Sequence, residues 1–274
     1  MALITVDTEK CINDELCQIA CPGFLIEIDN NGLPHPVSYI EDNCVRCGHC
    51  VAICPTDALF HSDLPQNEFI ETKEGLEMNP EAVGLFIKSR RSIRNYQDKP
   101  VPRELIENVI DIARYAPTGH NDQGVKYSIF DNKESLKNIA DSVIDFFKFL
   151  VSTNQDQGIP FDFNKLIAEY ENGVDVILRQ APVLIVTHEM INPMAGISSH
   201  IALTTLELAA KACNLGTCWA GFVMMAAVSG YEPLLKLFHL PEGQQFCGAM
   251  IMGHPQLKYK KIPVRNKPTI IWND

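Results

Sequence analysis

Seven of the ten cysteines in the 274-residue chain lie between Cys11 and Cys54, and their spacing repeats. The later segment has the pattern Cys-x2-Cys-x2-Cys-x3-Cys-Pro, formed by Cys44, Cys47, Cys50, Cys54 and Pro55. An offset of 33 residues relates it to an earlier segment, whose matching residues are Cys11, Cys17, Cys21 and Pro22. Buried structural cysteines would not keep one offset, so the repeat indicates thiols that act together. Thiolates are ligands of soft metals, and we expect metal binding here.

The four-cysteine run is typical of iron–sulfur clusters. Three thiolates with this spacing wrap one cluster, and the fourth ligates the neighbouring cluster of a pair. Zinc sites usually present two separated Cys-x2-Cys pairs instead. Crossing the fourth ligands predicts two ligand sets. The first set is Cys21, Cys44, Cys47 and Cys50, and the second is Cys11, Cys17 and Cys54, with Asp14 at the position that matches Cys47.

Asp14 leaves the second set with three thiolates and one carboxylate. An oxygen ligand holds iron less firmly than a thiolate does. This set therefore predicts either a [4Fe–4S] cluster with Asp14 as a ligand or a [3Fe–4S] cluster that lacks the iron beside Asp14. In a third interpretation, Asp14 is a solvated loop residue and water completes the site.

Composition limits the compartment and the partners. The N-terminus has no basic stretch followed by a long apolar run, and the longest apolar stretch, Cys218–Val228, has 11 residues. A membrane span needs about 20. We therefore expect a cytoplasmic protein, in which clustered cysteines bind metal rather than form disulfides. The net charge of −11 lies in residues 1–80, which hold 3 Lys or Arg against 14 Asp or Glu, so nucleic-acid binding is disfavoured.

Residues 1–60 resemble the two-cluster bacterial ferredoxins. The resemblance implies a small α+β domain whose folding energy comes largely from its clusters. The stretch 61–80 is polar, acidic and rich in turn-forming residues, which predicts a linker with the domain boundary near residue 75. Residues 81–274 then form a second domain.

In the second domain, helical periodicity alternates with short β-branched runs. The predicted helices run from Pro102 to Pro117, from Asn132 to about Leu150, over 164–179 and over Ile197–Asn214. The predicted strands are Val125–Phe130, Ala181–Thr187 and Phe246–Gly253. Helices and strands around one core predict an α+β domain. The helix Ile197–Asn214 is apolar nearly all round, so we expect it to be buried or at an interface.

Four polar segments of this domain suit an anionic heterocyclic cofactor. Residues 89–96 place three arginines beside two serines, and guanidinium groups fork onto phosphate oxygens. Residues 116–121 form a polar, glycine-containing loop after a predicted helix. Residues 215–221 combine a turn with small side chains that allow close backbone approach. Residues 258–265 are a second basic cluster.

In this order, the four segments resemble the nitroreductase family of FMN enzymes, over about residues 81–274. The resemblance implies an α+β homodimer with a central, mainly antiparallel sheet, FMN at the dimer interface and helix Ile197–Asn214 in that interface. The cofactor-binding residues that it implies are Arg90, Arg91, Ser92, Arg94, Pro117, Thr118, Gly119, Asn121, Trp219, Ala220, Gly221, Lys261 and Arg265. It places the amides of Ala220 and Gly221 near flavin N5, and the choice among Lys258, Lys260 and Lys261 stays open.

The two halves together predict an FMN-dependent oxidoreductase that receives electrons through iron–sulfur clusters. FMN carries the chemistry, so no side chain is assigned as catalytic. The acceptors implied are nitroaromatic, quinone-like or related organic molecules. The donors implied are a ferredoxin, a flavodoxin, a hydrogenase or NAD(P)H. The alternatives are an electron-transfer iron–sulfur flavoprotein and a redox sensor, neither with a dedicated small-molecule substrate.

Overall fold

The computed structural model describes residues 2–72 and 78–273, which divide into two compact units. Residues 2–72 with His120–Asp122 form the first unit, and Met78–Gly119 with residues 123–273 form the second. The domain boundary expected near residue 75 lies outside the described residues. The stretch 61–80 contains the 3-10 helix η1 (Gln66–Glu68), and α4 (Pro80–Lys88) begins at its end.

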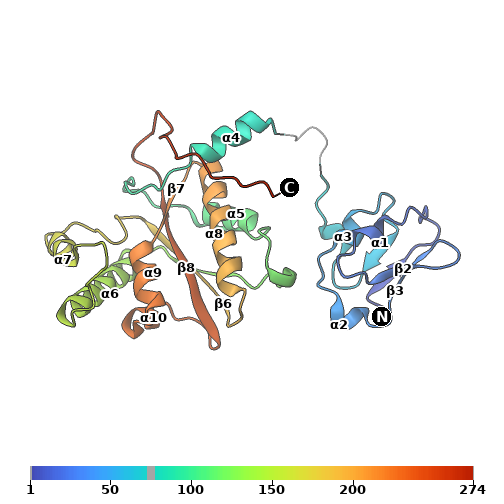
Figure 1. The fold of residues 1–274 in the computed structure, drawn as a ribbon, viewed down its shortest axis with the longest axis horizontal. Helices are drawn as coiled ribbons and strands as arrows, with labels where there is room; N and C mark the ends of the chain where they lie inside the picture. The colour runs from blue at the N-terminus through green and yellow to red at the C-terminus, as the bar shows by residue number, and fades with distance from the viewer. Residues whose placement is uncertain (1, 73–77, 274) are drawn as a thin grey trace. The chain divides into compact units, whose positions relative to one another are not determined.

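The first unit consists of short strands and single helical turns (Figure 1). Strand β1 (Ile4–Val6) pairs with β4 (Leu59–His61), and β2 (Ile26–Ile28) pairs with β3 (Pro34–Pro36), both antiparallel. The helices are α1 (Leu16–Ala20), α2 (Ile40–Asn43) and α3 (His49–Ala52). A small core includes Ile4, Ile26 and Leu59 together with the thiols of Cys17 and Cys50. Cysteine side chains thus form part of the hydrophobic core of this unit.

The 33-residue repeat of the sequence is also a repeat of backbone conformation. Glu15 and Gly48, which directly precede α1 and α3, both adopt the left-handed conformation, with φ of 60° and 72°. The same offset relates two further left-handed pairs, Asn13 with Arg46 and Phe24 with Asp57. This conformation costs a non-glycine residue roughly 1–2 kcal/mol. Matched left-handed residues at three places indicate that both segments wrap in the same way.

The second unit is built on one antiparallel sheet with helices on both faces (Figure 1). The strand order is β5 (Lys126–Phe130), β6 (Val183–Met190), β8 (Gln244–Gly253) and β7 (Gly216–Trp219). One face packs against α5 (Arg103–Ala113) and α8 (Ala195–Ala212), and the other against α6 (Lys133–Ser152), α9 (Gly221–Val228) and α10 (Glu232–Leu237). Side chains alternate along a strand. Val183 and Ile185 therefore pack on the face that α5 and α8 cover, and Leu184 and Val186 pack on the opposite face.

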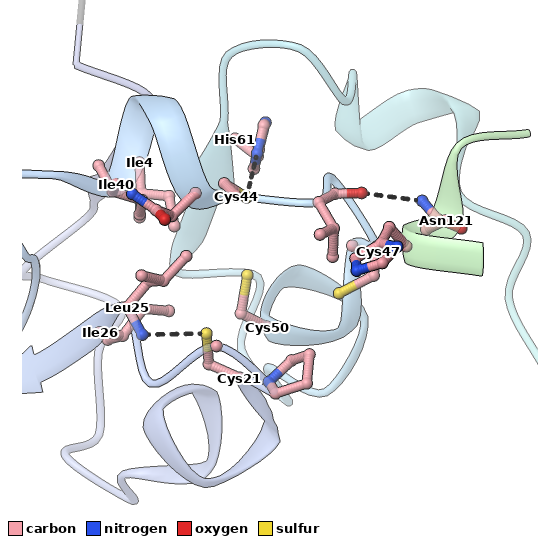
Figure 2. A pocket seen from close by; sticks show the side chains of 16 residues that line it. Ile4, Cys21, Leu25, Ile26, Ile40, Cys44, Cys47, Cys50, His61 and Asn121 are labelled. Carbon is pink, nitrogen blue, oxygen red and sulfur yellow. Dashed lines mark hydrogen bonds between the residues drawn. The ribbon is translucent and has the colours of Figure 1, made fainter. Parts of the chain in front are cut away.

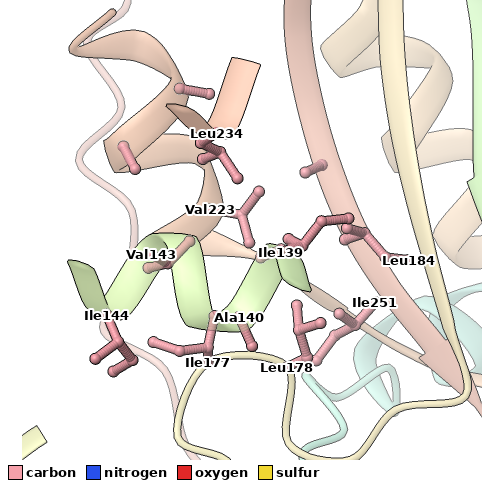
Figure 3. Close-up of a cluster of buried hydrophobic side chains, with 14 of the residues drawn as sticks. Ile139, Ala140, Val143, Ile144, Ile177, Leu178, Leu184, Val223, Leu234 and Ile251 are labelled. Carbon is pink, nitrogen blue, oxygen red and sulfur yellow. The ribbon is translucent and has the colours of Figure 1, made fainter. Parts of the chain in front are cut away.

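The larger core lies between α6 and the sheet. Figure 3 shows that Ile139 and Val143 lie on the side of α6 that faces Val223 of α9 and Leu234 of α10. Further along α6, Phe147 is fully buried, and its ring centroid lies 4.7 Å from that of Phe163 and 5.2 Å from that of Phe222. Aromatic packing thus fixes α6 against α7 (Phe163–Glu171) and α9.

Most elements lie where the sequence predicts them, and α6 begins as expected because the Asn132 side chain accepts from the amide of Ser135 (2.8 Å). The helix predicted over 164–179 is wrong in its second half, since α7 ends at Glu171 and Gly173 turns the chain with φ of 88°. Helix α8 is not buried all round in this single chain, because Ile197 is 53% and Ile201 38% exposed. Its place at an interface stays a prediction.

None of the helices within residues 2–72 and 78–273 combines the length and the apolar character that crossing a bilayer requires.

Candidate functional site

Cysteine side chains of the first unit line two separate cavities. The larger, of about 330 Å³, is lined by Cys21, Cys44, Cys47 and Cys50, which Figure 2 shows about one open space. The smaller, of about 20 Å³, is lined by Cys11, Asp14, Cys17 and Cys54. The fold therefore gathers the two ligand sets that crossing the fourth cysteines predicts, with Cys21 and Cys54 exchanged between segments.

The chemistry of the larger cavity fits a cluster with a positively charged iron core. Burial, with a smaller contribution from the nearby Cys21 and Cys47, raises the pKa of Cys50 to about 12. Gathering thiolates in this space is therefore costly unless a cationic partner, such as cluster iron, is bound among them. Among the described residues, no three His, Cys, Asp or Glu side chains converge as they would around a single metal ion. The four thiols line one cavity, as the ligands of a cluster must.

Hydrogen bonds to sulfur follow the repeat. The amide of Leu25 donates to Cys21 Sγ (3.3 Å), and 33 residues later the amide of Ala58 donates to Cys54 Sγ (3.2 Å). In each cavity, the sulfur that comes from the other segment therefore accepts a backbone N–H. The Thr56 hydroxyl adds a contact to Cys54 Sγ at 3.7 Å. A thiolate that accepts hydrogen bonds is stabilised in its charged form.

Sequence reasoning missed His61, which it assigned to the linker. His61 ends β4, is 5% exposed, and places Nε2 3.6 Å from Cys44 Sγ (Figure 2). Burial lowers the pKa of this imidazole. The one available signal was a polar residue six positions after Pro55, and that signal is too weak to indicate a site without the fold.

Asp14 lines the smaller cavity but is exposed, and its Oδ1 accepts from the amide of Leu16 (3.2 Å). One carboxylate oxygen thus supports the entry to α1. Ligation of iron by Asp14 stays a prediction.

In the second unit, cationic side chains gather where α4 ends. Arg90 Nη1 donates to Glu207 Oε1 of α8 at 2.8 Å, and Glu207 is 5% exposed. Burial raises the pKa of Glu207, and Arg90 opposes that shift. Lys211, one turn further along α8, donates to Ser89 Oγ (2.8 Å). Burial, and then the charge of Arg91, lowers the pKa of Lys211.

The hydrogen bonding of Arg91 indicates whether this cluster could bind an anion. Its Nη1 donates to the carbonyl of Lys88 (3.0 Å), but its buried Nε and Nη2 have no hydrogen-bond partner among the described residues. Buried N–H donors without an acceptor are costly. Glu207, the acid that lines this cluster, already binds Arg90. The surplus positive charge of Arg91 and Lys211 therefore suits a phosphate group, and neither Lys211 nor Glu207 was a sequence candidate.

The remaining loop residues are held by β7 and by α8. The Ser92 backbone bridges to Thr217, and the exposed Arg94 donates to the carbonyl of Ser92 (3.4 Å). The amide of Gly119 donates to Ser198 Oγ (3.3 Å), and a Cβ there would meet Met194 Cγ at 2.9 Å. This loop therefore requires glycine at position 119.

Two backbone amides are expected near flavin N5, those of Ala220 and Gly221. The amide of Ala220 donates to the carbonyl of Ala249 (3.0 Å), and its place near a flavin stays a prediction. Gly221 begins α9, and the first amides of a helix have no intrahelical acceptor. A Cβ on Gly221 would meet nothing within 4 Å, so its surroundings are open. The adjacent Trp219 stacks on His200, with ring centroids 5.3 Å apart.

The other residues predicted to bind FMN lie outside the α-helices and strands, and their role stays a prediction. Pro117 is exposed, and Thr118 Oγ1 accepts from the amide of Gln123 (3.0 Å). Asn121 is grouped with the first unit, where its side chain donates to the carbonyls of Val45 and Arg46, both at 3.1 Å. Lys261 and Arg265 are exposed on a segment without helix or strand, as are Lys258 and Lys260.

Comparison with known proteins agrees with this division. The model of the Nitroreductase family matches residues 87–254, and the model of the 4Fe-4S dicluster domain matches residues 5–58. The chain belongs to the nitroreductase family and carries an N-terminal iron–sulfur domain of the ferredoxin type. It is an oxidoreductase, with an α+β fold.

Three relatives illustrate the similarity. An FMN reductase [NAD(P)H] of Bacillus subtilis is 27% identical over 179 residues, which cover 65% of this chain and 67% of the relative. The ferredoxin named Ferredoxin 7Fe of Hydrogenibacillus schlegelii is 36% identical over 67 residues, covering 23% of this chain and 80% of the relative. The crystal structure of a nitroreductase with bound FMN from Desulfitobacterium hafniense superposes with a TM-score of 0.57 at 23% identity. That match covers 72% of this chain and all of the other.

Proposed function

We propose that this chain is an FMN-dependent oxidoreductase that takes up electrons through two iron–sulfur clusters and delivers them to a small organic acceptor. The observation that carries the proposal is the sorting of seven cysteines into two cavities, in a chain whose second unit belongs to the nitroreductase family. Iron–sulfur clusters supply single electrons, whereas FMN exchanges one or two. The combination suits the reduction of nitroaromatic or quinone-like molecules.

In this proposal, Cys21, Cys44, Cys47 and Cys50 ligate a [4Fe–4S] cluster. Cys11, Cys17 and Cys54 ligate the other cluster, which is either [4Fe–4S] with Asp14 as a ligand or [3Fe–4S]. The similarity to a ferredoxin named for seven irons supports the second form. Electron paramagnetic resonance of the oxidised protein distinguishes these two forms, because a [3Fe–4S] cluster is paramagnetic when oxidised. An oxidised sample without that signal leaves the four-iron form.

For FMN, the proposed contacts are the half-buried cationic groups and the start of α9. Arg91 and Lys211 hold the phosphate, with Ser92 and Arg94 beside them, and Gly221 offers an amide to the flavin ring. Arg90 holds the loop through its bond to Glu207. The names of the relatives support FMN and NAD(P)H as cofactor and donor. We further propose a homodimer, with a protein donor of low potential as the alternative to NAD(P)H.

Replacing Arg91 with glutamine should weaken FMN binding by about 10- to 100-fold, because hydrogen bonds to charged groups contribute roughly 1.5–3 kcal/mol each. Fluorescence titration of the flavin-free protein measures this dissociation constant. The matched control is Arg103→Gln, because Arg103 is exposed and its partner is Asp131 (2.8 Å). Equal affinities for the R91Q and R103Q variants would contradict the assignment of Arg91 to the phosphate.

The proposed function is tested most directly by anaerobic purification followed by iron, sulfide and flavin analysis. We expect seven or eight irons and one FMN per chain. The same sample should reduce a nitroaromatic when supplied with a reduced ferredoxin or with NAD(P)H. A protein that holds neither iron nor flavin would defeat the proposal.

A further inference from the structure

The larger cavity has one neighbouring side chain, His61, that the repeat does not explain. The backbone N–H···S bonds obey the 33-residue offset, because Leu25 and Ala58 donate to Cys21 and Cys54. The imidazole of His61 has no counterpart in the repeat, because the residue 33 positions earlier is Ile28, which has no side-chain donor. The larger cavity therefore has a polar side chain where the repeat alone would give an aliphatic one.

The hydrogen bonds of His61 settle which ring nitrogen faces the sulfur as a donor. Its Nδ1 accepts from the amide of Asp63 (3.1 Å), so the proton of the neutral ring is on Nε2. Nε2 lies 3.6 Å from Cys44 Sγ, within range of an N–H···S bond. A charged ring would carry a proton on Nε2 as well, so the donor role does not depend on the protonation state.

Neighbouring groups hold this ring in place. His61 pairs with Ile4 in the β1–β4 ladder and is 5% exposed. Asp63, whose amide donates to the ring, forms an ion pair with Arg46 (2.7 Å). Arg46 in turn donates to the carbonyl of Cys44 (3.2 Å). Asp63 and Arg46 therefore connect the ring to the backbone of Cys44, next to the N–H···S contact.

We propose that His61 sets the reduction potential of the cluster held by Cys44, by donating a hydrogen bond to that thiolate. Reduction by one electron adds negative charge to the cluster and its sulfurs. A fixed N–H dipole stabilises the more negative state, so it raises the potential. His61 is a positioning residue for electron uptake and takes no part in proton transfer. The inference rests on the proposed cluster site.

The experiment is an electron paramagnetic resonance redox titration of the full-length, anaerobically purified protein. His61→Ile copies the residue found at the repeat-related position. It should lower the reduction equilibrium constant of the all-cysteine cluster by about tenfold, or about 59 mV for one electron. His61→Gln keeps an N–H of similar reach and should restore most of the difference. Thr56→Val is the matched control, because Thr56 contacts Cys54 of the other cavity.

An H61I protein with full iron content and the wild-type potential would overturn the inference. If H61I does not retain iron, the comparison passes to His61→Asn, whose amide is too short to reach Cys44. A wild-type potential in H61N would overturn the inference, and a lowered one would support it. Wild-type protein that purifies without iron would instead defeat the proposed function.

Discussion

Replacing Cys50 with serine should remove the cluster of the larger cavity and stop electron delivery from a reduced ferredoxin. Cys50 is 8% exposed, lies on α3 and faces the same space as Cys21, Cys44 and Cys47. A serine oxygen is a harder and weaker ligand for cluster iron than a thiolate. The C50S protein should therefore lose about half of its iron, since each of the two clusters holds three or four.

The measurement compares two routes of reduction. With ferredoxin as donor, turnover of the nitro acceptor by C50S should fall to the background rate, whereas FMN content stays at the wild-type level. Direct reduction of the bound flavin by dithionite should still support turnover. Cys213→Ser is the matched control, because Cys213 lies in the second unit and lines neither cavity. Ferredoxin-driven turnover at the wild-type rate in C50S would show that electrons bypass this cluster.

Replacing Phe147 with alanine should destabilise the second unit by about 3–5 kcal/mol, the usual cost of truncating a buried aromatic residue. Its side chain is fully buried between Phe163 and Phe222, so the cavity left behind cannot fill easily. For a unit of this size, each kcal/mol lowers the melting temperature by about 2–4 °C, which gives a decrease of about 6–20 °C.

Thermal unfolding followed by far-ultraviolet circular dichroism measures this change, and release of FMN gives a second readout for the same unit. The matched control is Phe149→Ala on the same helix, because Phe149 is 45% exposed. Surface truncations of that kind usually change stability by about 0.5 kcal/mol or less. Equal melting temperatures for the F147A and F149A variants would show that the α6 core does not limit stability.

Much of this architecture could be predicted because its signals are local. The thiol spacing predicts the two ligand sets, and the cavities gather the same residues. The capping residue Asn132 marks the start of α6, and the run of β-branched residues marks β6. Helix α7 was predicted too long because residues 174–179 are as apolar as a helix face. The left-handed Gly173 ends the helix first.

The contacts that could not be predicted join residues far apart in the chain. The Arg90–Glu207 pair spans 117 positions, and the Lys211–Ser89 bond spans 122. No spacing rule connects such residues before the sheet and α8 place them together. The bond from the amide of Ala220 to the carbonyl of Ala249 on β8 is another such contact, and no sequence pattern indicates it. His61 was missed because a single histidine near a polar stretch carries no pattern.

The exchange of Cys21 and Cys54 between the two segments has an evolutionary consequence. Each segment supplies one thiol to the cavity of the other, so a single 33-residue segment cannot complete the ligand set of either cavity. If the repeat arose by gene duplication, the undivided ancestor completed its sites by pairing two identical chains. Fusion would then free the two copies to diverge, and the segments now differ at Asp14, opposite Cys47, and at His61, opposite Ile28.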